Sequence, residues 1–352
     1  MTRLATAGDA QGPMNRSIFI SLLGFGLTVP RAAHADPVSE LAGFSVFGGI
    51  NLTELAKGEV KTANGPAMSS PRFLSTQSCY VVPGSPAKAL EALRSWDPTA
   101  HRELKIYLHS DLSVSPTMGN FLRLKDAPDN SSVKALVNAT AKMSPELQIS
   151  REEAKKFAAT ANASGGAMPG PVVAFWTEIL AGRAQSFAAG GVSREAPYDH
   201  TNEAVSPAKE SSGLLRQQGK INRQFGGFLG ETGMIAGKGS LKPEMYWELL
   251  DVDDAGVLTL GAFYSRMTAG GGYQAVDGLY YSSGGYYVAL TLYQMWPVQV
   301  EAKASTLVWR GDLVSAASLG ELHGVERLAS ESAMKKDISK AINLFRRDIV
   351  GH

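Results

Sequence analysis

The fold is decided by four stretches near the C-terminus: Val257-Leu-Thr-Leu-Gly-Ala-Phe-Tyr264, Tyr273-Gln-Ala-Val-Asp-Gly-Leu-Tyr-Tyr281, Tyr286-Tyr-Val-Ala-Leu-Thr-Leu-Tyr-Gln-Met-Trp296 and Ser305-Thr-Leu-Val-Trp-Arg-Gly-Asp-Leu-Val314. All four are dense in β-branched and aromatic residues, which favour strands, and segments containing Gly or Pro separate them. Ser282-Ser-Gly-Gly285, between two Tyr-rich runs, is typical of a tight hairpin. Hairpins join neighbouring strands, so these stretches predict an antiparallel meander.

A further strand and a long helix border the meander. Tyr246-Trp-Glu-Leu-Leu-Asp-Val252 predicts the strand, and Asp253-Asp-Ala-Gly256 predicts its turn into the next one. From Gly324 to Gly351, apolar residues recur largely every three and four positions, whereas Lys and Arg fall largely elsewhere. The apolar positions are Val325, Leu328, Met334, Ile338, Ala341, Ile342, Phe345 and Ile349. A one-sided helix of this length needs a partner surface.

A strand and a short helix follow each other directly in the N-terminal half. Arg72–Val82 is the strand, and Pro83-Gly84 closes it. Ser85 is a good N-cap and Pro86 suits the first helical position, so a helix is expected over Ser85–Leu93.

The order of these elements resembles that of the START-type helix-grip superfamily. A strand, a helix, a second segment around Arg102–His109, a meander and a long terminal helix follow in that order. The closest similarity is Ser305–Val314 followed by a loop and Val325–Ile349. The resemblance rests on order and pattern, because the superfamily has no strict short motif. It implies an α+β fold in which a curved antiparallel sheet wraps around the long C-terminal helix, with an apolar ligand between them.

The resemblance covers roughly residues 72 to 112 and 240 to 350 of a helix-grip domain over 72 to 350. Residues 113 to 240 depart from it, because they contain several predicted helices and are therefore interpreted as a mainly helical insertion. Its role as a lid, a cap or a sub-domain stays open. The predicted helices are Asn130–Lys142, Ser150–Ala163, Val172–Leu180 and, more weakly, Leu214–Leu229.

The N-terminus predicts a secretory signal peptide over residues 1 to 35. Met14-Asn-Arg16 is positive, Ser17–Val29 is an apolar core of about a dozen residues, and Ala33-His-Ala35 fits a cleavage site. The apolar run is shorter than the roughly 20 residues that a spanning helix needs. Whether translation starts at Met1 or at Met14 stays open.

We therefore expect a periplasmic or secreted protein that begins near Asp36, with an irregular lead-in over residues 36 to 71. Cys79 is the only cysteine, so neither an intramolecular disulfide nor a lipid-modified cysteine after the cleavage site is possible, and no stable membrane anchor is expected. The 352 residues carry a net charge of +1 and are 44% hydrophobic, as in an ordinary globular protein. This balance gives no support to nucleic-acid binding.

Recognised catalytic and cofactor motifs are missing from the sequence. The spacing of His101, His109 and Asp111 fits no recognised metal site, so surface or loop roles are favoured. No Gly-x-Ser-x-Gly motif is present, and Cys79 lies in an apolar strand, as a buried structural cysteine does. The Gly-rich stretches lack the Lys-Ser/Thr of a phosphate loop. No cofactor and no metal are expected.

Charged residues within the strands allow two interpretations. Arg310 and Asp312 share one strand face, opposite Trp309, and either point to solvent or form a polar hook in a cavity. Gly311 lies on the apolar face, where a helix could approach. Glu248 is the better candidate for a single buried carboxylate.

The strands contain more aromatic residues than packing alone requires, which favours a cavity for a sterol-like or long-chain ligand. We expect the protein to bind a hydrophobic small molecule or lipid without transforming it. A cyclase- or hydrolase-like enzyme that uses the same cavity is one alternative, and an exported structural or interaction module is another. The predicted ligand-binding residues are Trp247, Glu248, Leu260, Tyr264, Leu290, Leu292, Trp309, Met334 and Ile338.

Overall fold

A computed structural model of the protein describes residues 36–157, 167–201, 203–235 and 237–351. The predicted signal peptide, residues 1 to 35, lies outside the described residues, as does most of the C-terminal half of the helix expected over Ser150–Ala163. In the described part of that range the helix is α5, Arg151–Ala154, which Ser150 caps at its N-terminus and Lys155 at its C-terminus, so it is shorter than predicted.

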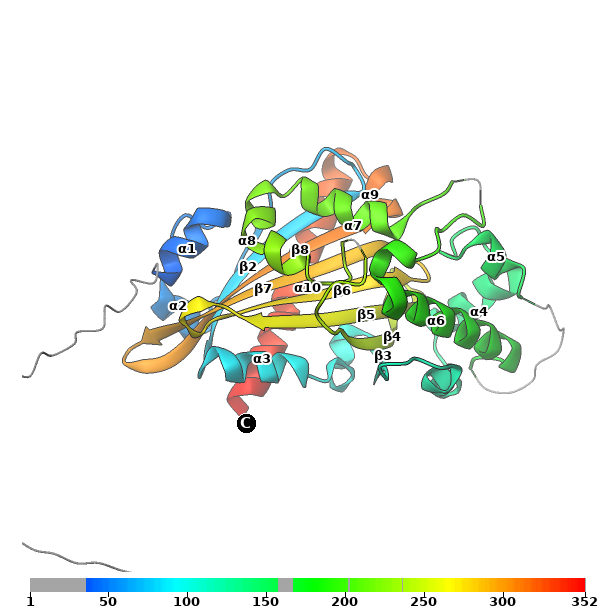
Figure 1. The fold of residues 1–352 in the computed structure, drawn as a ribbon, viewed down its shortest axis with the longest axis horizontal. Coiled ribbons are helices and arrows are strands. Elements are labelled where there is room, and N and C mark those ends of the chain that lie inside the picture. Colours follow the sequence, from blue (N-terminus) through cyan, green and yellow to red (C-terminus); the bar gives the residue numbers. More distant parts are fainter. Residues whose placement is uncertain (1–35, 158–166, 202, 236, 352) are drawn as a thin grey trace, which may run out of the picture. The chain divides into compact units, whose positions relative to one another are not determined.

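An eight-stranded antiparallel, curved sheet forms the centre of the fold (Figure 1), with the strand order β1-β2-β8-β7-β6-β5-β4-β3. The fold class is therefore α+β, and the predicted meander is confirmed as β4 to β8. Asp253 and Asp254 adopt positive φ in the turn between β4 and β5, as a tight hairpin requires. The strands are β1 Lys61–Asn64, β2 Phe73–Pro83, β3 Ile106–Asp111, β4 Glu244–Val252, β5 Ala255–Met267, β6 Tyr273–Ser282, β7 Tyr286–Val300 and β8 Lys303–Ala316.

One face of the sheet carries the C-terminal helix α10, Gly324–Gly351, and the predicted helix α3, Pro86–Arg94 (Figure 1). Ile338, Ile342 and Phe345 of α10 are buried with Tyr80 on β2. The long helix is thus confirmed.

The beginning of the predicted apolar stripe is wrong, since Val325 and Leu328 are exposed. The first turn of α10 is held by polar contacts: Arg327 donates from Nη1 to the carbonyl oxygen of Pro71 at 2.6 Å and from Nη2 to that of Phe73 at 2.7 Å. Apolar burial begins only where the helix lies over the sheet.

The other face of the sheet is covered by a helical layer (Figure 1), which α6, α7 and α8 dominate. Most of these helices come from the segment between residues 113 and 240. The helix expected over Leu214–Leu229 is two helices, which separate at Gln217 and Gln218. The helices of the chain besides α3, α5 and α10 are α1 Pro37–Phe44, α2 Leu52–Lys57, α4 Ser131–Lys142, α6 Gly170–Gly190, α7 Pro207–Arg216, α8 Gly219–Leu229 and α9 Ala317–Glu321, with short 3-10 turns η1 Pro98–Ala100, η2 Arg102–Leu104, η3 Met118–Asp126, η4 Gly191–Arg194 and η5 Ala269–Gly271.

The segment from residue 36 to 71, expected to be irregular, forms α1, α2 and β1. Leu41 and Leu55 are fully buried in the core of the helical layer. Asp36 and Asn51 accept hydrogen bonds from backbone N–H groups as the N-caps of α1 and α2. The short helices depend on these caps and on tertiary burial, and neither gives a strong periodic pattern.

A buried ion-pair network fastens the helical layer. Arg183 on α6 donates from Nε to Glu153 Oε1 at 2.7 Å and lies 3.4 Å from Glu195. Burial raises the pKa of Glu195 to about 8, although the charge of Arg183 opposes this rise.

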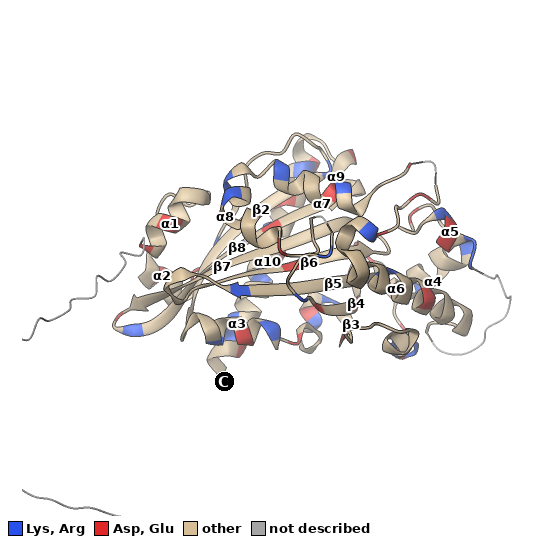
Figure 2. Cartoon of the chain, viewed as in Figure 1, with Lys and Arg blue, Asp and Glu red and all other residues tan. Residues whose placement is uncertain are grey.

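Charged residues lie mainly on helices and loops, and little charge is seen along the central strands (Figure 2). Within the described ranges, every helix is either too short or too polar to cross a lipid bilayer.

Candidate functional site

A cavity of about 360 Å³ lies between the sheet and α10. Its floor is formed by β4, β6 and β7, and its roof by Ala341, Ile342 and Phe345 of α10. Leu279, Ala289 and Thr291 lie in the middle of the sheet, yet each keeps part of its surface exposed. These side chains stay uncovered because α10 packs against the β1–β2 side of the sheet and against α3.

A second chamber of about 400 Å³ continues from the first towards the N-terminal part of α10. Ala289, Thr291, Arg310 and Ala341 line both chambers, so the two spaces meet at these side chains. The second chamber has an apolar lining that includes Leu74, Leu319, Met334 and Ile338.

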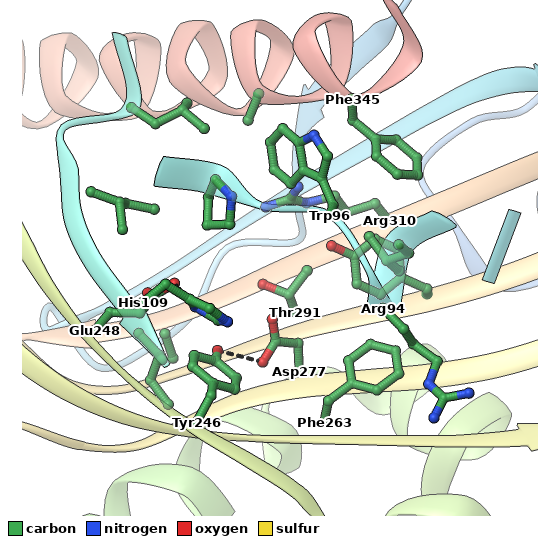
Figure 3. A pocket seen from close by; sticks show the side chains of 18 of the residues that line it. Arg94, Trp96, His109, Tyr246, Glu248, Phe263, Asp277, Thr291, Arg310 and Phe345 are labelled. Atoms are coloured by element: carbon green, nitrogen blue, oxygen red, sulfur yellow. Dashed lines mark hydrogen bonds and ion pairs between the residues drawn. The ribbon is translucent and has the colours of Figure 1, made fainter. Parts of the chain in front are cut away.

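The segment after α3, which forms a side wall of the first chamber, makes polar contacts with Asp348 of α10. Asp348 Oδ2 accepts a hydrogen bond from Trp96 Nε1 at 2.8 Å and lies 2.7 Å from His101 Nε2. Trp96 and Phe345 hang beneath α10, facing the polar residues of the sheet across the chamber (Figure 3). The segment after α3 therefore closes the space that the helix leaves open.

Tyr246 and Asp277 form a polar contact on the floor of the chamber (Figure 3), where the Tyr246 hydroxyl donates to Asp277 Oδ1 at 2.7 Å. The two residues lie on β4 and β6, so the ring crosses the intervening strand β5. Gly261 on β5 makes this crossing possible, because a Cβ there would collide with the Tyr246 ring. A glycine in mid-strand thus lets the Tyr246 ring reach Asp277.

An ion pair marks the junction of the chambers. Arg310 donates from Nε to Asp312 Oδ2 at 2.9 Å and from Nη2 to Oδ1 at 2.7 Å. Thr291 donates to the same carboxylate at 3.0 Å. The guanidinium carbon lies 5.7 Å from the centre of the Tyr293 ring. Arg310 and Asp312 therefore face the space under α10, as in the polar-hook interpretation, and the bulk solvent does not surround them.

His109 and Glu248 form a second pair at one end of the chamber. His109 Nδ1 lies 3.0 Å from Glu248 Oε1, and the imidazole stacks on the Tyr246 ring with 5.3 Å between centroids. Burial lowers the pKa of His109, but the hydrogen bond and charge of Glu248 outweigh burial, so the pKa is raised. Among the described residues, His109 makes its other side-chain ion-pair contact with Asp111, at 3.7 Å.

Among the described residues, the charged side chains around the first chamber form ion pairs, except that of Asp277. Arg94 lies 2.7 Å from Glu244, Arg310 is bound to Asp312, and His109 is bound to Glu248. Asp277 forms no ion pair with any described residue. Burial raises the pKa of Asp277 to about 6, although the hydrogen bond from Tyr246 opposes the rise.

The predicted ligand-binding residues divide between the two faces of the sheet. Glu248 lines the first chamber, Met334 and Ile338 line the second, and Leu290 borders the second while belonging to the opposite core. Five others pack against the helical layer and do not face α10: Trp247, Leu260, Tyr264, Leu292 and Trp309. Both faces of this sheet are covered, so a large apolar side chain does not identify the ligand side.

Gly311 lies on that opposite face, where the Trp309 ring packs over it. Phe44 of α1 and Phe225 of α8 pack against this ring. Cys79 is buried on the same face, where burial raises the pKa of its thiol to about 12. A thiol so far from ionisation at neutral pH is a structural residue and a poor nucleophile.

The sequence predicts Glu248 as a site residue and allows the polar-hook interpretation of Arg310 and Asp312. It does not predict that Tyr246, Asp277 and His109 lie in the same chamber. Asp277 gave the one available signal, since it is the only charged residue in the strand Tyr273–Ser282. Tyr246 and His109 gave none, because their meeting depends on the pairing of β3 with β4.

The described residues contain no group of three or more His, Cys, Asp or Glu side chains arranged to hold a metal ion. Comparison of the chain with protein-family models, with curated proteins and with solved structures found no match. The two chambers between the sheet and α10 are therefore the basis for the function proposed below.

Proposed function

We propose that the protein binds a small, mainly apolar molecule in the two chambers between the sheet and α10, without transforming it. One observation carries the proposal: the middle of the sheet keeps Leu279, Ala289 and Thr291 partly exposed beneath a long helix. A packed core would fill such a space with side chains. Enclosed, largely apolar cavities of this size with a few polar groups are typical of small-molecule sites.

The same arrangement supports a proposal about the fold, namely that the chain is a helix-grip protein of the START type. In this proposal the curved sheet wraps around α10, and residues 113 to 240 are an insertion that covers the other face of the sheet. The signal-like N-terminus supports export, and N-terminal sequencing of the exported protein would then begin near Asp36.

A second candidate is an enzyme that uses the same cavity, which the His109–Glu248 pair favours. A carboxylate that holds one imidazole nitrogen leaves the other able to accept a proton. Product formation from candidate esters, lost in His109→Gln, would promote this candidate over simple binding. No described hydroxyl or thiol forms a hydrogen bond with the His109 ring, so a nucleophile would have to come from water or from the ligand.

The binding proposal is tested by blocking the junction of the chambers. Ala341→Trp places an indole where both chambers meet, and we expect it to reduce binding of N-phenyl-1-naphthylamine, a neutral apolar probe, by about tenfold or more. Asn343→Trp is the matched control, because Asn343 is exposed on the same helix. Equal binding by both variants would show that the probe does not bind in the two chambers, and no binding by the wild type would favour the structural module.

A further inference from the structure

Asp277 is the carboxylate of the first chamber that makes no ion pair with any described residue, and Arg310 and His109 act on it only from a distance. The three cations of the first chamber, Arg94, Arg310 and His109, each pair with another carboxylate. Tyr246 supplies a hydroxyl donor at 2.7 Å but no charge. An enclosed carboxylate with a single neutral partner is costly, and a bound cation would offset that cost.

Aromatic rings surround this carboxylate on the floor, the wall and the roof. Tyr246 and Phe263 flank it on the sheet, and Trp96 and Phe345 face them across the chamber (Figure 3). Tyr80 and Tyr293 complete the lining. The faces of aromatic rings attract cations, and the attraction is strongest where water is excluded.

The second chamber adds negative charge at its edge and room for an apolar tail. Asp253 and Asp337 border it and are exposed, whereas Arg310 is the only Lys or Arg in its lining and is already bound to Asp312. Met334 and Ile338 of α10 and Leu319 of α9 provide apolar walls. A molecule with a charged end and an aliphatic chain can therefore extend from Asp277 under the helix.

We propose that the ligand is an amphipathic organic cation, an alkyl or aryl amine whose ammonium group binds Asp277 among the aromatic rings while its tail enters the second chamber. This inference rests on the proposed function and adds the chemical class of the ligand. The ammonium donates a hydrogen bond to the Asp277 carboxylate, and Tyr246 holds that carboxylate in place.

Three probes that share one chain test the proposal: octylamine, octanol and octanoate, each titrated calorimetrically into the wild type and Asp277→Asn at pH 7.5. We expect the wild type to bind octylamine at least about tenfold more tightly than octanol, with octanoate weakest. Asp277→Asn should abolish this preference and leave the affinity for octanol within about threefold. The amide keeps an acceptor for Tyr246, so the fold should be retained.

Acidity gives an independent measurement on the same protein. Lowering the pH through 6 protonates Asp277, so the preference for octylamine should decrease between pH 7.5 and 5. The other titratable groups near Asp277 are Tyr246 and Glu248 on β4, His109 on β3, Tyr293 on β7 and Arg310 on β8. Against the effect of burial, Glu248 raises the pKa of His109, so protonation of this imidazole is a second pH-dependent event in the chamber. Asp277→Asn must therefore lose most of the pH dependence if Asp277 is responsible.

The three probes distinguish a failure of the cation proposal from a failure of the binding proposal. Equal affinity for octylamine and octanol, both blocked by Ala341→Trp, overturns the cation proposal and leaves the binding function standing. Tightest binding of octanoate also overturns it and indicates Arg310 as the binding group. If none of the three probes binds the wild type, both proposals are contradicted.

Discussion

Asp277 combines the binding role proposed above with a cost to stability that its environment creates. The pKa of its carboxyl is about 6 in the folded chain, above the ordinary value of 3.8. The folded state therefore binds the proton more tightly than the unfolded state does, and this group makes the protein more stable as the pH falls from above 6 towards 4. Above pH 6 the buried carboxylate opposes folding of the ligand-free protein.

Replacing this carboxyl by an amide should accordingly stabilise the ligand-free protein. We expect Asp277→Asn to raise the free energy of unfolding by about 1 to 3 kcal/mol at pH 7.5, and the gain to disappear near pH 4. Urea denaturation at the two pH values measures it. Asp111→Asn, at the exposed mouth of the same chamber, should change the free energy by less than about 0.5 kcal/mol. Destabilisation by Asp277→Asn at pH 7.5 would show that the carboxylate is already compensated.

At the scale of elements, α10 is both the roof of the cavity and part of the core. Ile342 is 1% exposed beside Tyr80 and Phe345, whereas its neighbour Asn343 is exposed. Ile342→Asp would bury an unpaired charge and should lower the free energy of unfolding by several kcal/mol, about 3 or more. Asn343→Asp introduces the same side chain at the next position and should change it by less than about 0.5 kcal/mol. Similar losses from both, measured by denaturant unfolding, would mean that the helix is not docked through this face.

The sequence predicted these elements because each has a strong local signal. The four Tyr-rich stretches became β5 to β8, and Ser85 caps the helix that begins at Pro86. The N-terminal turns of α10 have the same periodicity as its docked part, but Val325 and Leu328 are exposed. Periodicity identifies an apolar face and does not say how far a partner surface extends along it.

For the whole molecule, the sequence does not show which face of the sheet borders the cavity, because the helical layer covers the face opposite α10. Thr291 and Leu292 are neighbours on β7, and the sequence predicts Leu292 as the ligand-binding residue because it is large and apolar. The helical layer buries Leu292, however, while Thr291 faces the cavity. The sequence predicts Glu248, Met334 and Ile338 as cavity residues, and they line the chambers under α10. The contact between Tyr246 and Asp277, in contrast, depends on the register of β4, β5 and β6 and on Gly261. Local patterns carry no information about such contacts.

Photolabelling can show directly whether the ligand site lies under α10, as proposed, or beneath the helical layer. The protein would be irradiated with an octylamine derivative carrying a terminal diazirine, then digested, and the labelled peptides would be identified by mass spectrometry. We predict labels on the β7 segment Ala289–Tyr293 and on α10 between Met334 and Phe345, all reduced by Ala341→Trp. Labels concentrated on α6 or α7, or unchanged by Ala341→Trp, would contradict the account.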